Sequence, residues 1–319
     1  MDSPPRPTPP DRTALAALIA DIAPGARLLH VRRLRGGLSA DVHAVELQLP
    51  SGEWRKYVVR RHRLAGRHAL PADTERESLL LSLLWSAGMP VPEPILADAG
   101  GAYFGVPMLV TAFAGRPLVQ PRQPQTWLRQ LAEALCSIHT INPERHDLSF
   151  LHTKLAAGMG EELARGLPPR LRGMPLAEEV HGVLTRRLGS ISWPAPTLVH
   201  DDYWPGNTVW VSNKLTAVVD WTDAQVSDPR ADISQCRIDL TAMHSEAYAD
   251  SFLDAYQRSR PDGPLPEVWF FDLFRGLRAL GSLDRWLPGY HDIGLARLSL
   301  APMMARLEQF LRHALERAH

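Results

Sequence analysis

The spacing of apolar residues changes twice in the first third of the chain. Apolar residues at helical spacing predict a helix over 13–22, with Asp11 or Thr13 as its N-cap. After this helix, apolar and polar residues alternate, most clearly over 42–49, which is the pattern of a half-buried strand. A helix over 74–87 follows, and a proline-rich segment ends it because proline cannot continue a helix. The strands expected here cover 27–34, 42–49, 56–62 and 108–113.

The remainder of the chain carries mainly helical spacing, with one interruption. Residues 197–220 read instead as a loop with two short apolar runs, 208–211 and 215–219, which predict a small hairpin. The helices expected here cover 127–139, 177–188, 246–258, 268–287 and 295–318. A strand-rich first part followed by a helical part predicts an α+β fold with two lobes.

The expected domain boundaries follow from this change of pattern. Residues 1–12, with five prolines among the first ten, are expected to form a disordered tail. Residues 13–114 then form an N-terminal lobe, and residues 115–319 form a helical C-terminal lobe. A chain of 319 residues is long enough for two lobes.

Composition narrows the class of protein. The chain has 35 basic and 35 acidic residues, and this neutral balance argues against a nucleic-acid partner. The longest uncharged stretch, residues 99–115, is broken by glycines and a proline, so no membrane span is expected. The two cysteines, Cys136 and Cys236, form no motif and are expected to be buried apolar residues. These features together predict a cytoplasmic protein, and they leave the oligomeric state open.

One segment concentrates side chains that suit phosphoryl transfer. It reads HDDYWPGN over 200–207, and Asp220 follows the predicted hairpin. Phosphoryl transfer needs a carboxylate that accepts the proton of the acceptor hydroxyl, and oxygen ligands for the magnesium that neutralises the phosphates. Asp202, Asn207 and Asp220 can together supply this set of two carboxylates and one amide oxygen. The competing interpretation makes Asp202 and Asn207 ordinary turn residues and Asp220 a charge that follows a buried strand.

At this point the chain resembles the aminoglycoside phosphotransferase family, whose relatives include choline kinases and, more distantly, protein kinases. The resemblance rests on HDDYWPGN, on VDWT over 219–222 and on SDPRADI over 227–233, with weaker matches over 36–40, 58–60, 76–78 and 111–117. It implies a protein-kinase-like fold in which the N-terminal lobe binds ATP or GTP with Mg²⁺.

The resemblance also implies individual roles. Asp202 would be the catalytic base, and Asn207 and Asp220 would be the magnesium ligands. Other residues would bind the nucleotide. Gly36, Gly37 and Ser39 would lie over the phosphates, where glycine permits close approach of the backbone. Arg60 would contact phosphate and pair with Glu77, and the backbone of Thr111 to Phe113 would hold the edge of the base.

Several of these residues have simpler alternatives. Arg61 or Lys56 could replace Arg60 as the phosphate-contacting cation. Glu77 stands three positions after Thr74, so the two could form a capping box. The glycine pair at 36–37 could be a plain hairpin turn. Two further residues are expected to be structural: His200 would orient the loop, and Asp232 would anchor it by accepting backbone N–H groups.

The acceptor is the least determined part of the prediction. Asp201 stands where the family has glycine, Trp204 where it commonly has histidine, and Thr222 where an acidic residue is common. A cationic acceptor, such as an aminoglycoside, is one expectation, and Asp201, Trp204 and Asp223 are the candidate contacts, with Asp250 and Asp254 as a further pair.

Three functions therefore compete. The first is a magnesium-dependent small-molecule O-phosphotransferase, in a resistance or a metabolic role. The second is a metabolite kinase of the choline, homoserine or sugar type. The third is a non-catalytic nucleotide-binding pseudokinase, which would not need Asp202, Asn207 and Asp220 together.

Overall fold

A computed structural model describes residues 9–34, 40–62, 70–154 and 156–318 of the chain. These residues divide into two compact units. The N-terminal unit contains the described residues up to Gly115 together with Ala217–Thr222, and the C-terminal unit contains Arg116–Thr216 and the described residues from Asp223 onward. The α+β architecture predicted from the sequence is confirmed. The expected tail lies mostly in residues 1–8, outside the described residues.

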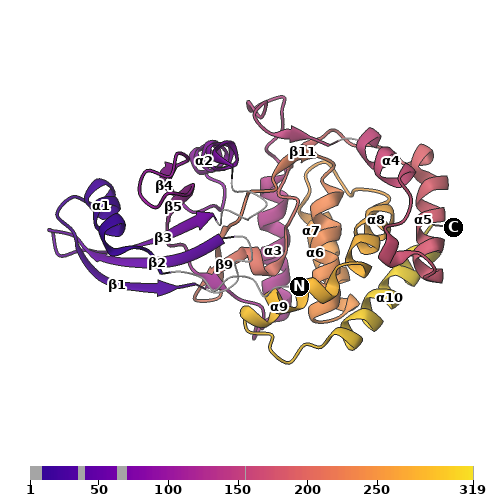
Figure 1. Cartoon of the computed structure of the whole chain (residues 1–319). Helices are drawn as coiled ribbons and strands as arrows, with labels where there is room; N and C mark the ends of the chain where they lie inside the picture. Colours follow the sequence, from indigo (N-terminus) through magenta and orange to yellow (C-terminus); the bar gives the residue numbers. More distant parts are fainter. Residues whose placement is uncertain (1–8, 35–39, 63–69, 155, 319) are drawn as a thin grey trace. The chain divides into compact units, whose positions relative to one another are not determined.

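The N-terminal unit is built on a five-stranded antiparallel sheet with the order β1-β2-β3-β5-β4 (Figure 1). Its strands are β1 (Arg27–Arg33), β2 (Ala40–Gln48), β3 (Trp54–His62), β4 (Pro94–Asp98) and β5 (Met108–Ala112). Two helices complete the unit: α1 (Arg12–Ile22) and α2 (Pro71–Ser86). Strand β4 was not expected from the sequence. It begins at Pro94, and its residues do not alternate between buried and exposed, so the two-residue period of a strand is not visible.

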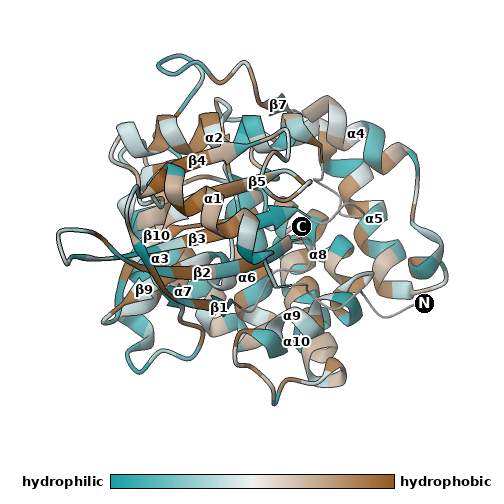
Figure 2. Cartoon of the chain, turned by 60° about the vertical axis from the view of Figure 1, so that its left-hand side comes forward, coloured by the Kyte–Doolittle hydropathy of each residue, from teal (hydrophilic) through white to brown (hydrophobic). Residues whose placement is uncertain are grey.

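Helix α1 covers the sheet with its apolar face. Asp11 caps it by accepting hydrogen bonds from the backbone N–H groups of Thr13 and Ala14, at 3.0 and 2.9 Å. Brown hydrophobic positions mark α1 and β5 in Figure 2. The buried cluster between α1 and the sheet comprises Leu15, Leu18, Ile19, Ala23, Val45, Leu47, Val59, Met108 and Val110. Burial of this apolar surface stabilises the packing of α1 against one face of the sheet.

Helix α2 begins earlier than the sequence predicted. Pro71 stands at its start, a position that proline tolerates because its missing N–H would be unpaired there anyway. Thr74 is therefore inside the helix and fully buried, and not at its N-cap. The capping-box interpretation of Thr74 and Glu77 is wrong for this reason, and Glu77 points to a different partner.

The C-terminal unit is mainly helical (Figure 1). Its helices are α3 (Pro124–Ile138), α4 (Ala156–Ala164), α5 (Pro175–Arg187), α6 (Arg230–Met243), α7 (Glu246–Ser259), α8 (Val268–Leu280), α9 (Leu283–Asp292) and α10 (Leu300–Glu316). The helix predicted over 268–287 is in fact two helices, because the chain turns at Gly281. The last helix starts at Leu300 instead of residue 295.

Helix α6 was missed by the sequence analysis. All fourteen of its residues are buried, so it has no polar face and therefore no amphipathic period. It packs against α7, α8 and α10 and forms the centre of the unit. Its buried polar residues include Asp232 and Asp239. Asp232 contacts the loop that carries the motif, and Asp239 contacts Tyr290 of α9.

Short strands position the segment that contains the motif. Strand β8 (Thr197–Val199) precedes it, and β11 (Gln225–Ser227) pairs with β8 on one side and with β7 (His152–Thr153) on the other. The predicted hairpin is present as β9 (Thr208–Val211) and β10 (Lys214–Val218), and β6 (Arg116–Pro117) pairs with β9. Among the described residues no helix is long and apolar enough to cross a bilayer.

Candidate active site

The predicted base and one predicted metal ligand are in direct contact. Asn207 ends a short 3₁₀ turn, Pro205–Asn207, and its side chain is only 8% exposed. Its Nδ2 donates to the carbonyl oxygen and to Oδ2 of Asp202, each at 2.9 Å. Because the amide nitrogen faces Asp202, the amide oxygen is turned away from that carboxylate. The amide nitrogen thus restrains the predicted base, and the amide oxygen is directed elsewhere.

Asp232 anchors the loop that carries Asp202, as the sequence analysis predicted. It lies in the first turn of α6 and is fully buried. Its two carboxylate oxygens accept the backbone N–H groups of His200 and Asp201, both at 2.7 Å. Burial acts to raise the pKa of Asp232, but hydrogen bonds from His139 and His200 outweigh burial and leave this pKa below its ordinary value. Asp232 is therefore a charged acceptor that fixes the loop backbone.

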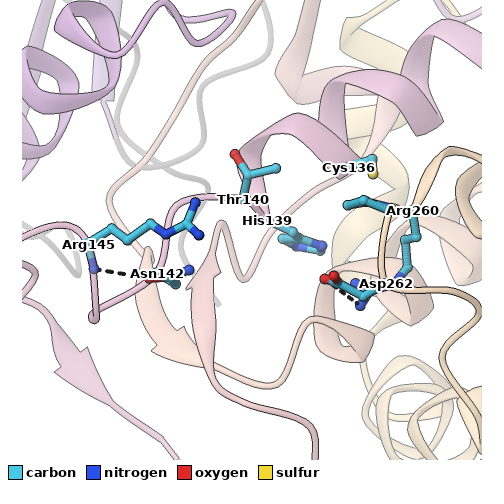
Figure 3. Close-up of a pocket in the computed structure, with 8 residues that line it drawn as sticks. Cys136, His139, Thr140, Asn142, Arg145, Arg260 and Asp262 are labelled. Carbon is cyan, nitrogen blue, oxygen red and sulfur yellow. Dashed lines mark hydrogen bonds and ion pairs between the residues drawn. The ribbon is translucent and has the colours of Figure 1, made fainter.

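His139 extends this anchor toward α7. It follows α3 and is buried, with Nε2 3.2 Å from Oδ2 of Asp232 and Nδ1 2.6 Å from the hydroxyl of Tyr256. The ionised Asp232 requires a donor, so Nε2 carries the proton and Tyr256 donates to Nδ1. His139 also lines a cavity of about 290 Å³, together with Thr140, Arg260 and other residues shown in Figure 3.

The sequence analysis treated His139 as an ordinary core or surface residue. Its position just after an amphipathic helix was visible in the sequence, but neither of its partners was. Tyr256 is 117 positions away and Asp232 is 93 positions away.

Asp201 forms an ion pair with Arg275 of α8. The Arg275 side chain is 7% exposed, and Asp201 adopts a left-handed backbone conformation with φ of 64°. The carboxylate next to the predicted base is thus matched by a buried guanidinium. Arg275 was not among the residues that the sequence indicated, because it lies 74 positions from Asp201 within a helix pattern.

Trp204 packs against a buried polar group of α9. Its ring lies edge-on to Tyr290, with centroids 5.4 Å apart, and the Tyr290 hydroxyl donates to Oδ1 of Asp239. Gln235 donates to the other oxygen of Asp239 at 2.8 Å. Burial raises the pKa of Asp239 to about 6, with these two hydrogen bonds acting in the opposite direction. Trp204 itself is partly exposed.

The third predicted catalytic residue belongs to the N-terminal unit. Asp220 follows β10 in a left-handed conformation with φ of 67°, which Asp tolerates better than most residues. Its Oδ1 accepts from Arg60 at 2.7 Å, and its side chain is 41% exposed. Arg60 on β3 also forms an ion pair with Glu77 of α2, and Glu77 Oε1 accepts the backbone N–H of Trp221 at 3.2 Å. Arg60 therefore links Glu77 to Asp220.

Burial dominates the electrostatics of this trio. Burial raises the pKa of Glu77, and the negative charge of Asp220 adds to that increase, while Arg60 opposes it. Glu77 is 3% exposed, so an uncompensated charge there would be costly. The arrangement favours Arg60 over its two alternatives. Lys56 pairs with Glu46 at 2.8 Å, and the guanidinium of Arg61 lies over the ring of Phe104.

The segment predicted to hold the base of the nucleotide is partly engaged in the sheet. Thr111 belongs to β5, and the N–H of Phe113 donates to the carbonyl of Lys56 at 2.9 Å. The ammonium of Lys56 also lies 4.2 Å from the Phe113 ring centroid. A nucleotide could use this N–H only by breaking that bond. Gly36, Gly37 and Ser39 lie outside the described residues.

Two acidic candidates for acceptor contact differ in their surroundings. Asp223 is exposed to solvent. Asp250 on α7 is 3.1 Å from Arg237, whose guanidinium also pairs with Asp272 at 3.1 Å. Asp250 is therefore already paired with a buried arginine, which does not favour it as a contact for a cationic molecule.

The donor set fits magnesium rather than a soft metal. Among the described residues, no three His, Cys, Asp or Glu side chains converge as they would in a zinc-type site. Magnesium is bound through one or two carboxylates and the phosphates of its substrate, so it needs no such cluster. The amide oxygen of Asn207 and the carboxylate of Asp220 are hard oxygen donors of the required kind.

The family model for the phosphotransferase enzyme family matches residues 30–269. This match covers the sheet of the N-terminal unit, the motif loop and the helices through the start of α8. The fold and the site thus define a kinase-like phosphotransferase. The chain belongs to the phosphotransferase enzyme family.

Solved structures agree on the fold. A candidate aminoglycoside phosphotransferase from Ralstonia eutropha aligns with a TM-score of 0.67 and 18% identity, over 97% of this chain and 98% of the other. Choline kinase LicA from Streptococcus pneumoniae aligns at 0.60 and 14% identity, over 96% and 98% of the two chains. The GDP and kanamycin complex of APH(2″)-IIIa aligns at 0.60 and 18% identity, over 96% and 99%. No curated protein matches the chain.

Proposed function

We propose that this phosphotransferase moves the γ-phosphoryl group of ATP or GTP to a hydroxyl of a small molecule, with Asp202 as the catalytic base. The observation that carries the proposal is the double hydrogen bond from Asn207 to Asp202, on a loop fixed by Asp232. A turn that served only the fold would not need a carboxylate held at both its backbone and its side chain. A scaffold protein would gain nothing from keeping it.

The reaction needs little covalent help from the protein. The acceptor oxygen forms a bond to the γ-phosphorus while the bond between that phosphorus and the bridging oxygen breaks, so the nucleoside diphosphate leaves. The proton of the acceptor hydroxyl passes to a carboxylate oxygen of Asp202. Asn207 restricts the rotation of that carboxylate, which keeps it in a productive orientation.

Asn207 and Asp220 are the proposed ligands of Mg²⁺. When bound, the metal neutralises charge on the phosphate oxygens. Arg60 contributes a second positive charge for phosphate, and Glu77 holds it in place. Gly36, Gly37 and Ser39, with the backbone of Thr111 to Phe113, complete the proposed nucleotide contacts.

The acceptor class is proposed from the neighbourhood of Asp202. Trp204 offers an aromatic face, which suits a cationic or ring-bearing molecule. An aminoglycoside-like acceptor comes first, since one structural neighbour is a kanamycin complex, with Trp204 and Asp223 as the proposed contacts. A choline-type acceptor is the second possibility, because another neighbour is a choline kinase. Nucleoside triphosphate donors are most abundant in the cytoplasm, where we expect the enzyme to act.

Transfer of label from γ-³²P-ATP and γ-³²P-GTP tests this proposal. The acceptor panel contains kanamycin, choline, homoserine and a simple sugar, each with magnesium and each with excess EDTA. We expect labelled product from at least one acceptor, abolished by EDTA. Kanamycin labelling would place the enzyme among antibiotic-modifying phosphotransferases, whereas labelling of choline, homoserine or sugar alone would make it a metabolite kinase. Tight nucleotide binding without transfer to any acceptor or to water would contradict the proposal and indicate a pseudokinase.

A further inference from the structure

The backbone at Asp201 is in a conformation that asparagine, aspartate and glycine tolerate but that still costs free energy for a residue with a Cβ. Its φ of 64° lies in the left-handed region. For an L-residue this region is less favourable than the right-handed one, because the Cβ approaches the following carbonyl oxygen. The turn sits directly before Asp202, so its backbone direction determines where the Asp202 side chain points.

Two contacts hold Asp201 in this conformation. The first is its backbone N–H, which donates to Asp232 at 2.7 Å. The second is its carboxylate, which pairs with the buried guanidinium of Arg275 on α8. Helix α8 belongs to the C-terminal unit (Figure 1). A helix is a rigid support, so Arg275 can fix the side chain of Asp201.

Nearby carboxylates compensate for the burial of the Arg275 guanidinium. Burial lowers the pKa of Arg275, but the carboxylate of Asp201, followed by those of Asp232 and Asp202, outweighs burial and leaves the pKa above its ordinary value. Arg275 is thus the guanidinium that faces three carboxylates of the loop and its anchor. Removing it would leave the half-buried carboxylate of Asp201 without its guanidinium partner, next to Asp202.

We propose that Arg275 is a positioning residue for phosphoryl transfer: by holding the carboxylate of Asp201, it fixes the left-handed turn from which Asp202 extends and draws the Asp201 charge away from the base. The inference rests on the proposed function. It gives Asp201 a positioning role in place of the direct acceptor contact that the sequence suggested.

A double-mutant cycle on kcat tests this inference, because Arg275 should matter only while Asp201 is present. The variants are Arg275→Met, Asp201→Gly and the two combined. Magnesium with ATP or GTP is the substrate and water is the phosphoryl acceptor, so that no acceptor needs to be known. We expect Arg275→Met alone to lower kcat by about 10- to 100-fold, as small displacements of catalytic groups do, with KM for the nucleotide changed less than about threefold. In the Asp201→Gly background the same substitution should lower kcat by less than about threefold.

Two further variants keep the test decisive. Arg278→Met removes an exposed arginine one turn along the same helix and should leave kcat unchanged. If Arg275→Met fails to fold, Arg275→Lys keeps the charge but lacks the planar fork, and its smaller loss of kcat should likewise disappear in the Asp201→Gly background.

The outcomes separate the two levels of the argument. If the wild-type protein hydrolyses neither nucleotide and labels no acceptor, the proposed function fails and this inference fails with it. If the wild-type protein is active and the loss of kcat at position 275 is equal in both backgrounds, or absent, only the positioning role is overturned.

Discussion

The side-chain amide of Asn207 lies within 2.9 Å of both the carbonyl oxygen and the carboxylate of Asp202. Five positions separate the two residues, and a 3₁₀ turn folds Asn207 back onto the start of the loop. The contact makes the two residues one structural element. A change at either position should therefore alter the orientation of the other, and the effects of two changes should not add.

Glu77 should stabilise the N-terminal unit through Arg60. Glu77→Gln keeps the shape of the side chain but leaves the guanidinium of Arg60 with Asp220 as its remaining carboxylate partner. We expect the free energy of unfolding to fall by about 3 kcal/mol, the lower end of the cost of breaking a buried pair. KM for the nucleotide should rise, because Arg60 loses its fixed position. Urea unfolding and nucleotide titration measure both effects.

The matched control is Glu75→Gln, an exposed position on the same helix. It should change stability by less than about 0.5 kcal/mol. Equal effects at positions 75 and 77 would contradict the role given to Glu77.

Asp232 should determine the order of the catalytic loop. Asp232→Asn replaces one accepting oxygen by a donor, so at least one of the N–H groups of His200 and Asp201 loses its partner. We expect a loss of about 1–3 kcal/mol in the free energy of unfolding and faster hydrogen exchange at these two amides. Tyr256→Phe removes the outer hydrogen bond to His139 and the weaker one from Arg260 at 3.4 Å, and should cost about 1 kcal/mol.

Asp254→Asn serves as the control for this measurement, because Asp254 is exposed on α7. Unchanged exchange at His200 and Asp201 in the Asp232→Asn variant would show that the loop is held by other contacts.

Asp239 should make stability depend on pH in the opposite sense to most carboxylates. Burial raises its pKa from 3.8 to about 6 in the folded chain. Between about pH 4 and pH 6 the folded chain therefore keeps a proton that the unfolded chain has lost, so the free energy of unfolding falls as pH rises. The fall is complete above the folded-state pKa. The difference between about 6 and 3.8, at 1.36 kcal/mol per pKa unit, makes it on the order of 3 kcal/mol.

Urea unfolding at about pH 4 and about pH 7 for the wild type and Asp239→Asn isolates this contribution. The asparagine cannot ionise, so the variant should lack the fall and should gain stability relative to the wild type as pH rises. Parallel pH profiles for the two proteins would show that Asp239 titrates normally.

The helices and strands that could be predicted from the sequence are those with one solvent-exposed face. Strands β2 and β3, the hairpin of β9 and β10, and helices α3 and α7 all show a clear period, because one side of each meets solvent or a different layer. Helix α6 shows none, because every residue in it is buried. Its arginines and aspartates are each paired inside the unit, which no local sequence pattern indicates.

The candidate site divides in the same way. Asp202, Asn207 and Asp220 could be predicted because they lie in a local motif and directly after a hairpin of fixed length. Arg275, His139 and Tyr256 were missed because their contacts with Asp201, with Asp232 and with each other join residues far apart in the sequence. No local pattern encodes such a contact. Only the folded chain shows that Asp201 pairs with Arg275 and that Asp232 is hydrogen-bonded to His139.

The most direct test of the account is the rate of γ-phosphoryl transfer by Asp202→Asn, measured with labelled nucleotide at saturating concentration. The amide cannot accept the proton, so kcat should fall by about 10²- to 10⁴-fold, while nucleotide affinity and the free energy of unfolding stay close to those of the wild type. Asp147→Asn, at an exposed loop position, should have wild-type kcat. A wild-type rate in the Asp202→Asn variant would contradict the assignment of Asp202 as the base.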